Sequence, residues 1–148
     1  IHNLDYGTNS KVHYAFQKPV WRDLGSSGGV YSDNDSGLTH LQAVWESSQS
    51  LASPSSAILT DYSSSSRGIG IGQIDAQADA AQFLNNIDSL YTYIQNKKNV
   101  APNPQFISSQ MKQEMGKWVI NVVNWPNDPY SKGSYTNNQP NYFIQIAD

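Results

Sequence analysis

The side chains that most often carry acid–base, nucleophilic or metal chemistry are sparse in this sequence. Its three histidines stand at positions 2, 13 and 40, and it has no cysteine. No serine stands at a strand-to-helix elbow to support a Ser-His-Asp site, and no set of residues has metal-ligand spacing. A single histidine on a strand, such as His13, is more often structural than catalytic. The sequence therefore favours neither a hydrolytic triad nor a metal centre.

A glycine run at residues 68–72, with glycine at every second position, superficially resembles a phosphate-binding loop. A dinucleotide fingerprint needs the spacing G-x-G-x-x-G between a strand and a helix. Here the third glycine comes one residue early, and a run of serines precedes it. We interpret the run as a flexible connection into the helix that follows. The chain thus offers no recognisable site for an adenine dinucleotide.

The most informative segment lies near the C-terminal end, where aromatic, proline and glycine residues stand at fixed spacing. It reads W-P-N-D-P-Y-S-K-G-S-Y from Trp125 to Tyr135. This resembles the W-x-x-D-P-Y-S-x-G-S-Y segment of the flavin-containing amine oxidases, a family that includes monoamine, polyamine and L-amino-acid oxidases and lysine-specific histone demethylases. Eight positions agree with that pattern.

Two further segments resemble the same family, in the same order along the chain. Gly7, Lys11, Val12, Phe16 and Trp21 fit its strand pattern G-x-x-x-K-V-x-x-x-F-x-x-x-x-W. The pair Gly28-Gly29 stands where several L-amino-acid oxidases also carry two glycines. Residues 57–62, ending in Tyr62, resemble a strand that ends in a substrate-contacting tyrosine in L-amino-acid oxidases. Together the three matches span nearly the whole chain.

The resemblance implies oxidation of an amine or L-amino acid to an imine, using FAD and oxygen, with release of hydrogen peroxide. In the family, a lysine at the position of Lys11 reaches the flavin and holds a water against its N5 atom. A cation there favours the charge that develops as the flavin is reduced. Lys11 is therefore the candidate catalytic residue, and Lys11 and Trp125 are the candidate cofactor contacts.

Tyr62 and Tyr135 are the candidate substrate-binding residues that the resemblance implies. The Tyr62 hydroxyl would bind a substrate carboxylate, and Tyr135 would face the cavity with its aromatic ring. Trp45 and Tyr130 are further candidates for lining that cavity. Asp128, Pro129 and Gly133 are expected to be structural, with the glycine permitting positive φ in a tight turn that aims Tyr135.

Family segments that hold most of the FAD are not found in these 148 residues. These are the Gly-rich dinucleotide segment and the later Gly-Glu-His-Thr segment. Arg22 and Arg67 do not match the arginine that pairs the substrate carboxylate in amino-acid oxidases. We therefore expect residues 1–148 to be the substrate-binding domain of a larger oxidase, as a fragment or as one processed chain. Its partners would be the remaining FAD-binding segments or chains, and alone it would be inactive.

Periodicity along the chain predicts an α+β fold, a mixed β-sheet with one long and one short helix. The resemblance implies that this fold is like the substrate-binding domain of flavin amine oxidases. Apolar residues at helical spacing predict the long helix over residues 75–95, with Asp75 as its N-cap and Lys97 and Lys98 closing it. The short helix is expected near 107–115. Strands are expected at 11–16, 41–45, 57–62 and, as a buried strand, 118–125. Loops are expected at 25–37 and 63–66, with a turn at 53–55.

Composition leaves a second class of function open. Charged residues make up 14% of the chain and the net charge is −3, without a basic patch, so nucleic-acid binding is not expected. No apolar run is long enough to span a bilayer. The alternative to an oxidase is a freestanding, non-catalytic binding module for a carbohydrate or peptide. Its binding surface would be the tyrosine- and asparagine-rich end, residues 130–142.

Overall fold

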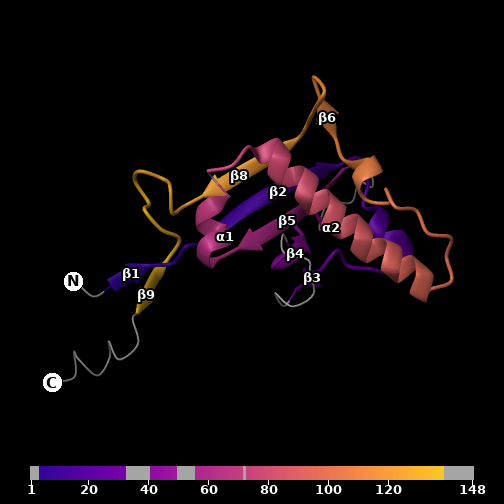
Figure 1. Ribbon diagram of the computed structural model, residues 1–148, viewed down its shortest axis with the longest axis horizontal. Coiled ribbons are helices and arrows are strands. Elements are labelled where there is room, and N and C mark those ends of the chain that lie inside the picture. The colour runs from indigo at the N-terminus through magenta and orange to yellow at the C-terminus, as the bar shows by residue number, and fades with distance from the viewer. Residues whose placement is uncertain (1–3, 33–40, 50–55, 72, 139–148) are drawn as a thin grey trace.

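The chain folds around one antiparallel sheet with helices packed on one of its faces (Figure 1). The computed structural model describes residues 4–32, 41–49, 56–71 and 73–138. The main sheet has the order β3-β4-β5-β2-β8, formed by Val30–Tyr31, Ala43–Glu46, Ala57–Ser63, Ser10–Phe16 and Ile120–Asn124. Two strand pairs complete the description: β1 (Leu4–Tyr6) with β9 (Thr136–Asn138), and β6 (Gln113–Glu114) with β7 (Lys117–Trp118). The α+β prediction with one long and one short helix is confirmed.

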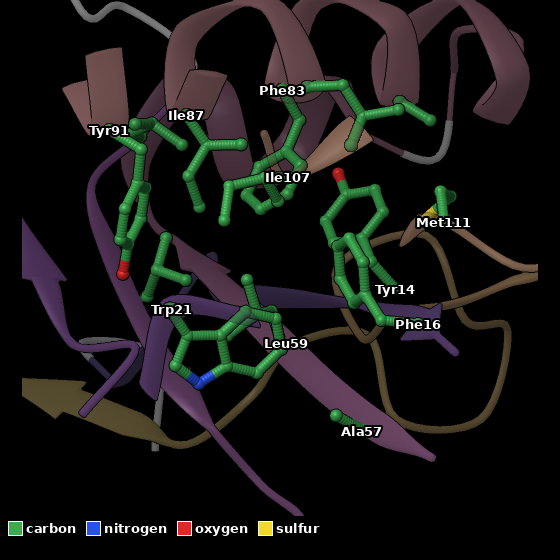
Figure 2. Close-up of a cluster of buried hydrophobic side chains, with 14 of the residues drawn as sticks. Tyr14, Phe16, Trp21, Ala57, Leu59, Phe83, Ile87, Tyr91, Ile107 and Met111 are labelled. Atoms are coloured by element: carbon green, nitrogen blue, oxygen red, sulfur yellow. The ribbon is translucent and has the colours of Figure 1, made fainter. Parts of the chain in front are cut away.

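The long helix α2, Ala76–Lys97, forms where the periodicity predicts it. The Asp75 side chain accepts a hydrogen bond from the Gln77 backbone N–H at 3.0 Å, which satisfies one of the free amides of the first turn. The helix lies across the sheet and buries its apolar stripe there: Ala80, Phe83, Leu84, Ile87 and Tyr91 (Figures 1 and 2). At its far end the Lys98 ammonium donates to the Leu24 carbonyl oxygen.

The side chains of β2 differ between the two faces of the sheet, because successive side chains point in opposite directions. Val12, Tyr14 and Phe16 point into the core and are at most 1% exposed. The Tyr14 ring stacks on Phe83 of α2, with ring centroids 3.9 Å apart. Lys11, His13 and Ala15, which alternate with them, point to the opposite face, which we call the cavity face. The predicted alternation of this strand is confirmed.

The cavity face is arranged in rows across three neighbouring strands, set by their antiparallel registers. In the first row Lys11 of β2 lies between Tyr62 of β5 and Val123 of β8. In the second row His13 lies between Thr60 and Asn121. In the third row Ala15 pairs with Ile58, and the Ala15 amide donates to the Val119 carbonyl oxygen.

The short helix α1, Ser65–Gly70, lies where we expected a polar loop and a flexible glycine connection, so both of those predictions are wrong. Gly68 is buried in this helix, at a position where no larger side chain would fit. A Cβ at this position would lie 1.9 Å from the Thr8 carbonyl oxygen. The Ser10 hydroxyl also donates to the Gly68 carbonyl oxygen at 2.6 Å. The glycine is thus a packing residue that joins α1 to the start of β2.

Two other predictions fail in the C-terminal half. The helix expected at 107–115 is only a 3-10 turn, Ser108–Gln110, which precedes the β6–β7 hairpin. Met115 and Gly116 have φ values of 50° and 75°, which turn the chain between those strands. The strand expected at 118–125 is present as β8, but as an edge strand of half-buried residues rather than a buried one.

The remaining loop predictions have mixed outcomes. A further 3-10 turn, Val20–Leu24, follows β2 and buries Trp21. The loop expected at 25–37 contains the short strand β3, and its residues 33–37 lie outside the described residues, as does the turn expected at 53–55. The strands expected at 41–45 and 57–62 are present as β4 and β5. Within the described chain, no helix is long and apolar enough to cross a membrane.

Candidate functional site

Lys11 extends from the first row of the cavity face into a group of three aromatic rings. Its Nζ lies 5.8 Å from the ring centroid of Trp45, 5.8 Å from that of Tyr62 and 5.6 Å from that of Trp125. The Trp45 and Tyr62 rings also contact one another, with centroids 5.8 Å apart and planes tilted by 46°. A cation at these distances is attracted by the negative face of each ring. The Lys11 ammonium is therefore held on the cavity face.

A cavity of about 180 Å³ opens beside this ammonium. We call it the Lys11 cavity, and its lining residues are Lys11, Tyr62, Trp125, Ser134 and Tyr135. The four residues that the sequence marked as candidate contacts thus lie around one space, although they come from three distant parts of the chain. Complete small-molecule pockets usually measure about 300–1,000 Å³. The Lys11 cavity, at about 180 Å³, is smaller than this range.

Tyr62 contributes a phenol to this cavity. Partial burial, and secondarily the electrostatic effect of neighbouring Tyr135, raise the pKa of Tyr62 above its ordinary value. The hydroxyl therefore keeps its proton at neutral pH and can donate a hydrogen bond. Tyr135 is 53% exposed in this chain, so much of its surface is available to another group. The two residues form a polar, aromatic side of the cavity.

The segment that carries Tyr135 is fixed by close contact with the start of the chain. Gly7 and the C-terminal segment exchange backbone hydrogen bonds, from the Gly7 amide to the Tyr135 carbonyl at 2.6 Å and from the Ser134 amide to the Gly7 carbonyl at 2.8 Å. The Ser134 hydroxyl in turn donates to Asn9 Oδ1 at 3.1 Å. A Cβ on Gly7 would lie 2.8 Å from the Tyr135 ring. Tyr135 is therefore packed directly over Gly7.

Asp128 and Gly133 shape the turn before Tyr135, partly for reasons other than those we expected. Asp128 Oδ1 accepts from the backbone amides of Tyr130 and Ser131 at 3.0 and 2.6 Å, as predicted. These bonds lower the pKa of the Asp128 carboxyl. Gly133, however, does not have a positive φ, so that explanation is wrong. A Cβ there would lie 2.1 Å from the Tyr6 Cβ, so close approach requires the glycine.

Two lining candidates behave differently from one another. The Trp45 ring lies against Lys11 and Tyr62, beside the Lys11 cavity. Tyr130 is 93% exposed and is not among the lining residues of that cavity.

Ser134 lines the cavity, although the sequence assigned it no role beyond its place in the motif. Its position after Gly133, opposite Gly7, became evident only from the pairing of the two chain segments.

The two arginines and His13 have structural partners. Arg22 pairs with Glu46, and hydrogen bonds from Arg22, Trp21 and Ser48 lower the pKa of this carboxyl in spite of its burial. Arg67 pairs with the buried carboxylates of Asp61 and Asp79, at 2.8 and 3.2 Å. His13 Nδ1 lies 2.8 Å from Thr60 Oγ1.

Among the described residues, no group of histidine and carboxylate side chains has the geometry to hold a metal ion. The cavity face instead presents one ammonium, two phenols and two indoles around a shallow space. Such a surface can bind the face or edge of a flat ring and a small polar substrate next to it.

The family is established by a match of residues 1–144 to the model of the flavin-containing amine oxidoreductases, and the chain belongs to that family. No curated protein matches it by sequence. Solved structures share its fold. A triple mutant of putrescine oxidase superposes with a TM-score of 0.65 at 16% identity, over 99% of this chain and 28% of that one. Cyclohexylamine oxidase from Brevibacterium oxydans IH-35A gives a TM-score of 0.59 at 17% identity, with the same coverage of 99% and 28%. The chain thus spans little more than a quarter of these oxidases.

Proposed function

We propose that this chain is the substrate-binding portion of an FAD-dependent oxidase that converts an amine or L-amino acid to an imine and releases hydrogen peroxide. One observation carries the proposal. Lys11, Tyr62, Trp125 and Tyr135 come from separate strands and a C-terminal segment, and all line one cavity. The parent protein would supply the segments that hold most of the FAD. The chain by itself would have no oxidase activity.

The residues present fit the edge of a flavin rather than a whole FAD molecule. The Lys11 cavity of about 180 Å³ is too small for a dinucleotide. Trp125 and Lys11 would contact the cofactor, Trp125 as an aromatic wall and Lys11 as a cation. Bound FAD would supply the two-electron acceptor for the oxidation.

Each of this chain's residues would have a separate task at that wall. The Lys11 ammonium would stabilise negative charge that develops near it, an effect that is stronger where water is excluded. The Tyr62 hydroxyl would donate a hydrogen bond to the substrate, and the Tyr135 ring would cover the substrate and exclude water. Arg22 and Arg67 would not contact the substrate because Glu46, Asp61 and Asp79 already bind them.

Family membership favours a small-molecule amine as the substrate class. An amino-acid substrate would place its carboxylate beside Tyr62 and Lys11. A panel of amines and L-amino acids, tested with the intact flavoprotein and peroxide detection, separates these two classes. Activity with neither class would contradict the oxidase proposal.

Lys11→Met in the intact flavoprotein tests the role of the cation. We expect flavin reduction or reoxidation in stopped-flow to slow by at least about tenfold, because a preorganised charge in a dry site contributes more than 1.4 kcal/mol. The thermal midpoint should change little. Lys117→Met, an equivalent change at an exposed residue of β7, is the matched control. Unchanged flavin kinetics in Lys11→Met would remove this residue from the mechanism.

A further inference from the structure

A second hollow lies on the cavity face, beyond the Lys11 cavity along β2. Its volume is about 210 Å³, and its lining residues are His13, Ala15, Ile58, Val119, Ile120 and Asn121. We call it the apolar hollow. Three of these residues, Ala15, Ile58 and Val119, are aliphatic and lie on this face, whereas Ile120 pairs with Tyr14 and packs against the core. The small Ala15 side chain leaves the space between its neighbours open. None of the roles proposed above uses it.

The apolar hollow lies on the same face of β2 as the candidate site. Lys11, His13 and Ala15 occupy the same face, in successive rows of the sheet. Each row adds two residues, or about 7 Å along the strand. The hollow therefore begins about 7 Å from Lys11 and extends to about 13 Å. A molecule that lies along β2 with one end at Lys11 would reach the hollow with the other.

The apolar hollow would accept an apolar group and disfavour a charged one. Burial, and secondarily the nearby Lys11 cation, lower the pKa of His13, so its imidazole is neutral at neutral pH. Thr60 Oγ1 lies 2.8 Å from His13 Nδ1 and 2.6 Å from the Ser47 hydroxyl, which ties the imidazole to the sheet. A second ammonium placed here would lose water without meeting a carboxylate among the lining residues.

The size of the hollow sets the kind of group that fits. A cavity of about 150 Å³ lined by aliphatic and aromatic residues is large enough to bind benzene. The apolar hollow, at about 210 Å³, has room for a phenyl ring or a short alkyl chain. A short amine such as propylamine could not reach it from Lys11.

We propose that the apolar hollow is a second subsite, which receives the apolar end of an amine whose amino group lies at the Lys11 cavity. This inference rests on the proposed function and deepens it. It assigns the protein a preference for long or aryl-substituted monoamines over short monoamines and over diamines of equal length. His13 and Ala15 are then specificity-determining residues, beyond the direct reach of the oxidised carbon.

The experiment compares kcat/KM for propylamine, hexylamine, octylamine and the corresponding diamines, using the intact flavoprotein. For each methylene buried in the hollow, kcat/KM should rise by about fourfold. Ala15→Leu would add three carbon atoms to the hollow and displace about two methylenes of a long amine, so the ratio of octylamine to propylamine should fall by at least about tenfold. Ala78→Leu, the same change at an exposed position of α2, should leave that ratio unchanged. A ratio that is near one in the wild type, or is unaffected by Ala15→Leu, would overturn the proposal.

A second variant tests the charge preference and guards against a misfolded Ala15→Leu. Ile58→Asp would place a carboxylate in the hollow and should shift preference from hexylamine toward the diamine of equal length. No shift toward the diamine would count against the subsite. Calorimetric Kd values for the same amines separate the two proposals. If no amine is oxidised but Kd still depends on chain length and on Ala15→Leu, the oxidase proposal fails and the subsite stands. Oxidation with flat chain-length dependence gives the reverse result.

Discussion

Gly68 provides the sharpest test of how this fold positions its candidate site. In Gly68→Ala the new Cβ would lie 1.9 Å from the Thr8 carbonyl oxygen and 2.8 Å from that of Ser63. Both neighbours are backbone atoms, one in the segment before β2 and one at the end of β5, so neither can move without shifting the chain there. Helix α1 must therefore separate from the segment that leads into β2. That segment ends at Ser10, directly before Lys11.

The cost can be worked from the contacts at this point. The Gly68 carbonyl oxygen accepts hydrogen bonds from the Ser10 hydroxyl at 2.6 Å and from Asn124 Nδ2 at 3.1 Å. Loss of two such bonds costs about 2 kcal/mol, and overpacking costs about 1–3 kcal/mol. The higher helix propensity of alanine offsets about 1 kcal/mol. We therefore expect Gly68→Ala to lower the free energy of unfolding by about 2–4 kcal/mol.

Gly70, two residues along the same helix, is the matched control. A Cβ at Gly70 meets no atom within 4 Å, so Gly70→Ala should stabilise the protein by up to about 1 kcal/mol. Urea denaturation of both variants measures the difference, and amide hydrogen exchange at Ser10 to Val12 shows whether β2 is loosened at its start. Equal stability of the two variants would refute the packing role of Gly68 and restore the idea of a flexible connection.

Three further predictions concern the site and its support. Burial raises the pKa of Asp61 to about 6 despite its pairing with Arg67. Because the folded state holds this proton more tightly than the unfolded state, the free energy of unfolding should fall by about 3 kcal/mol as pH rises from about 4 to 6. Asp61→Asn should abolish that slope in denaturation measured across pH. Trp45→Leu removes one of the rings around Lys11, so the rate of reductive methylation of Lys11, measured by mass spectrometry, should rise about two- to fivefold. An unchanged rate would mean that the Trp45 ring does not restrain the Lys11 ammonium. Tyr135→Ala should weaken substrate binding more than thermal stability, because the side chain is 53% exposed; loss of stability with intact affinity would assign the ring to the fold.

The parts of the fold that the sequence predicts well are those with long, regular periodicity. Helix α2 has a continuous apolar stripe and an Asp75 cap, and β2 alternates strictly over Val12, Tyr14 and Phe16. Helix α1 has neither feature. Its glycines favour a loop by propensity, and only the close approach of Thr8 explains why one of them is buried in a helix. That contact joins residues about sixty positions apart, which local patterns do not report.

The C-terminal half shows the same limit from another side. Residues near 107–115 have enough apolar side chains for a helix, but Asp88 Oδ1 of α2 accepts from the amides of Ile107 and Ser108 at 2.7 and 3.2 Å. This long-range cap fixes a single 3-10 turn. The chain then reaches Met111, which bridges to Phe16 in an extended conformation. Tertiary hydrogen bonds thus override the local preference for a longer helix.

The candidate site depends on the register between β2 and β5, which no motif in the sequence states. Lys11 and Tyr62 share the cavity face because they are paired across these strands. A slip of one residue would turn Tyr62 into the core and bring Asp61 to the cavity. The buried ion pair of Asp61 with Arg67 of α1 opposes that slip, since it holds Asp61 on the helix side of the sheet. The residue before Tyr62 therefore positions it, and an ion pair outside the cavity determines which side chains form its wall.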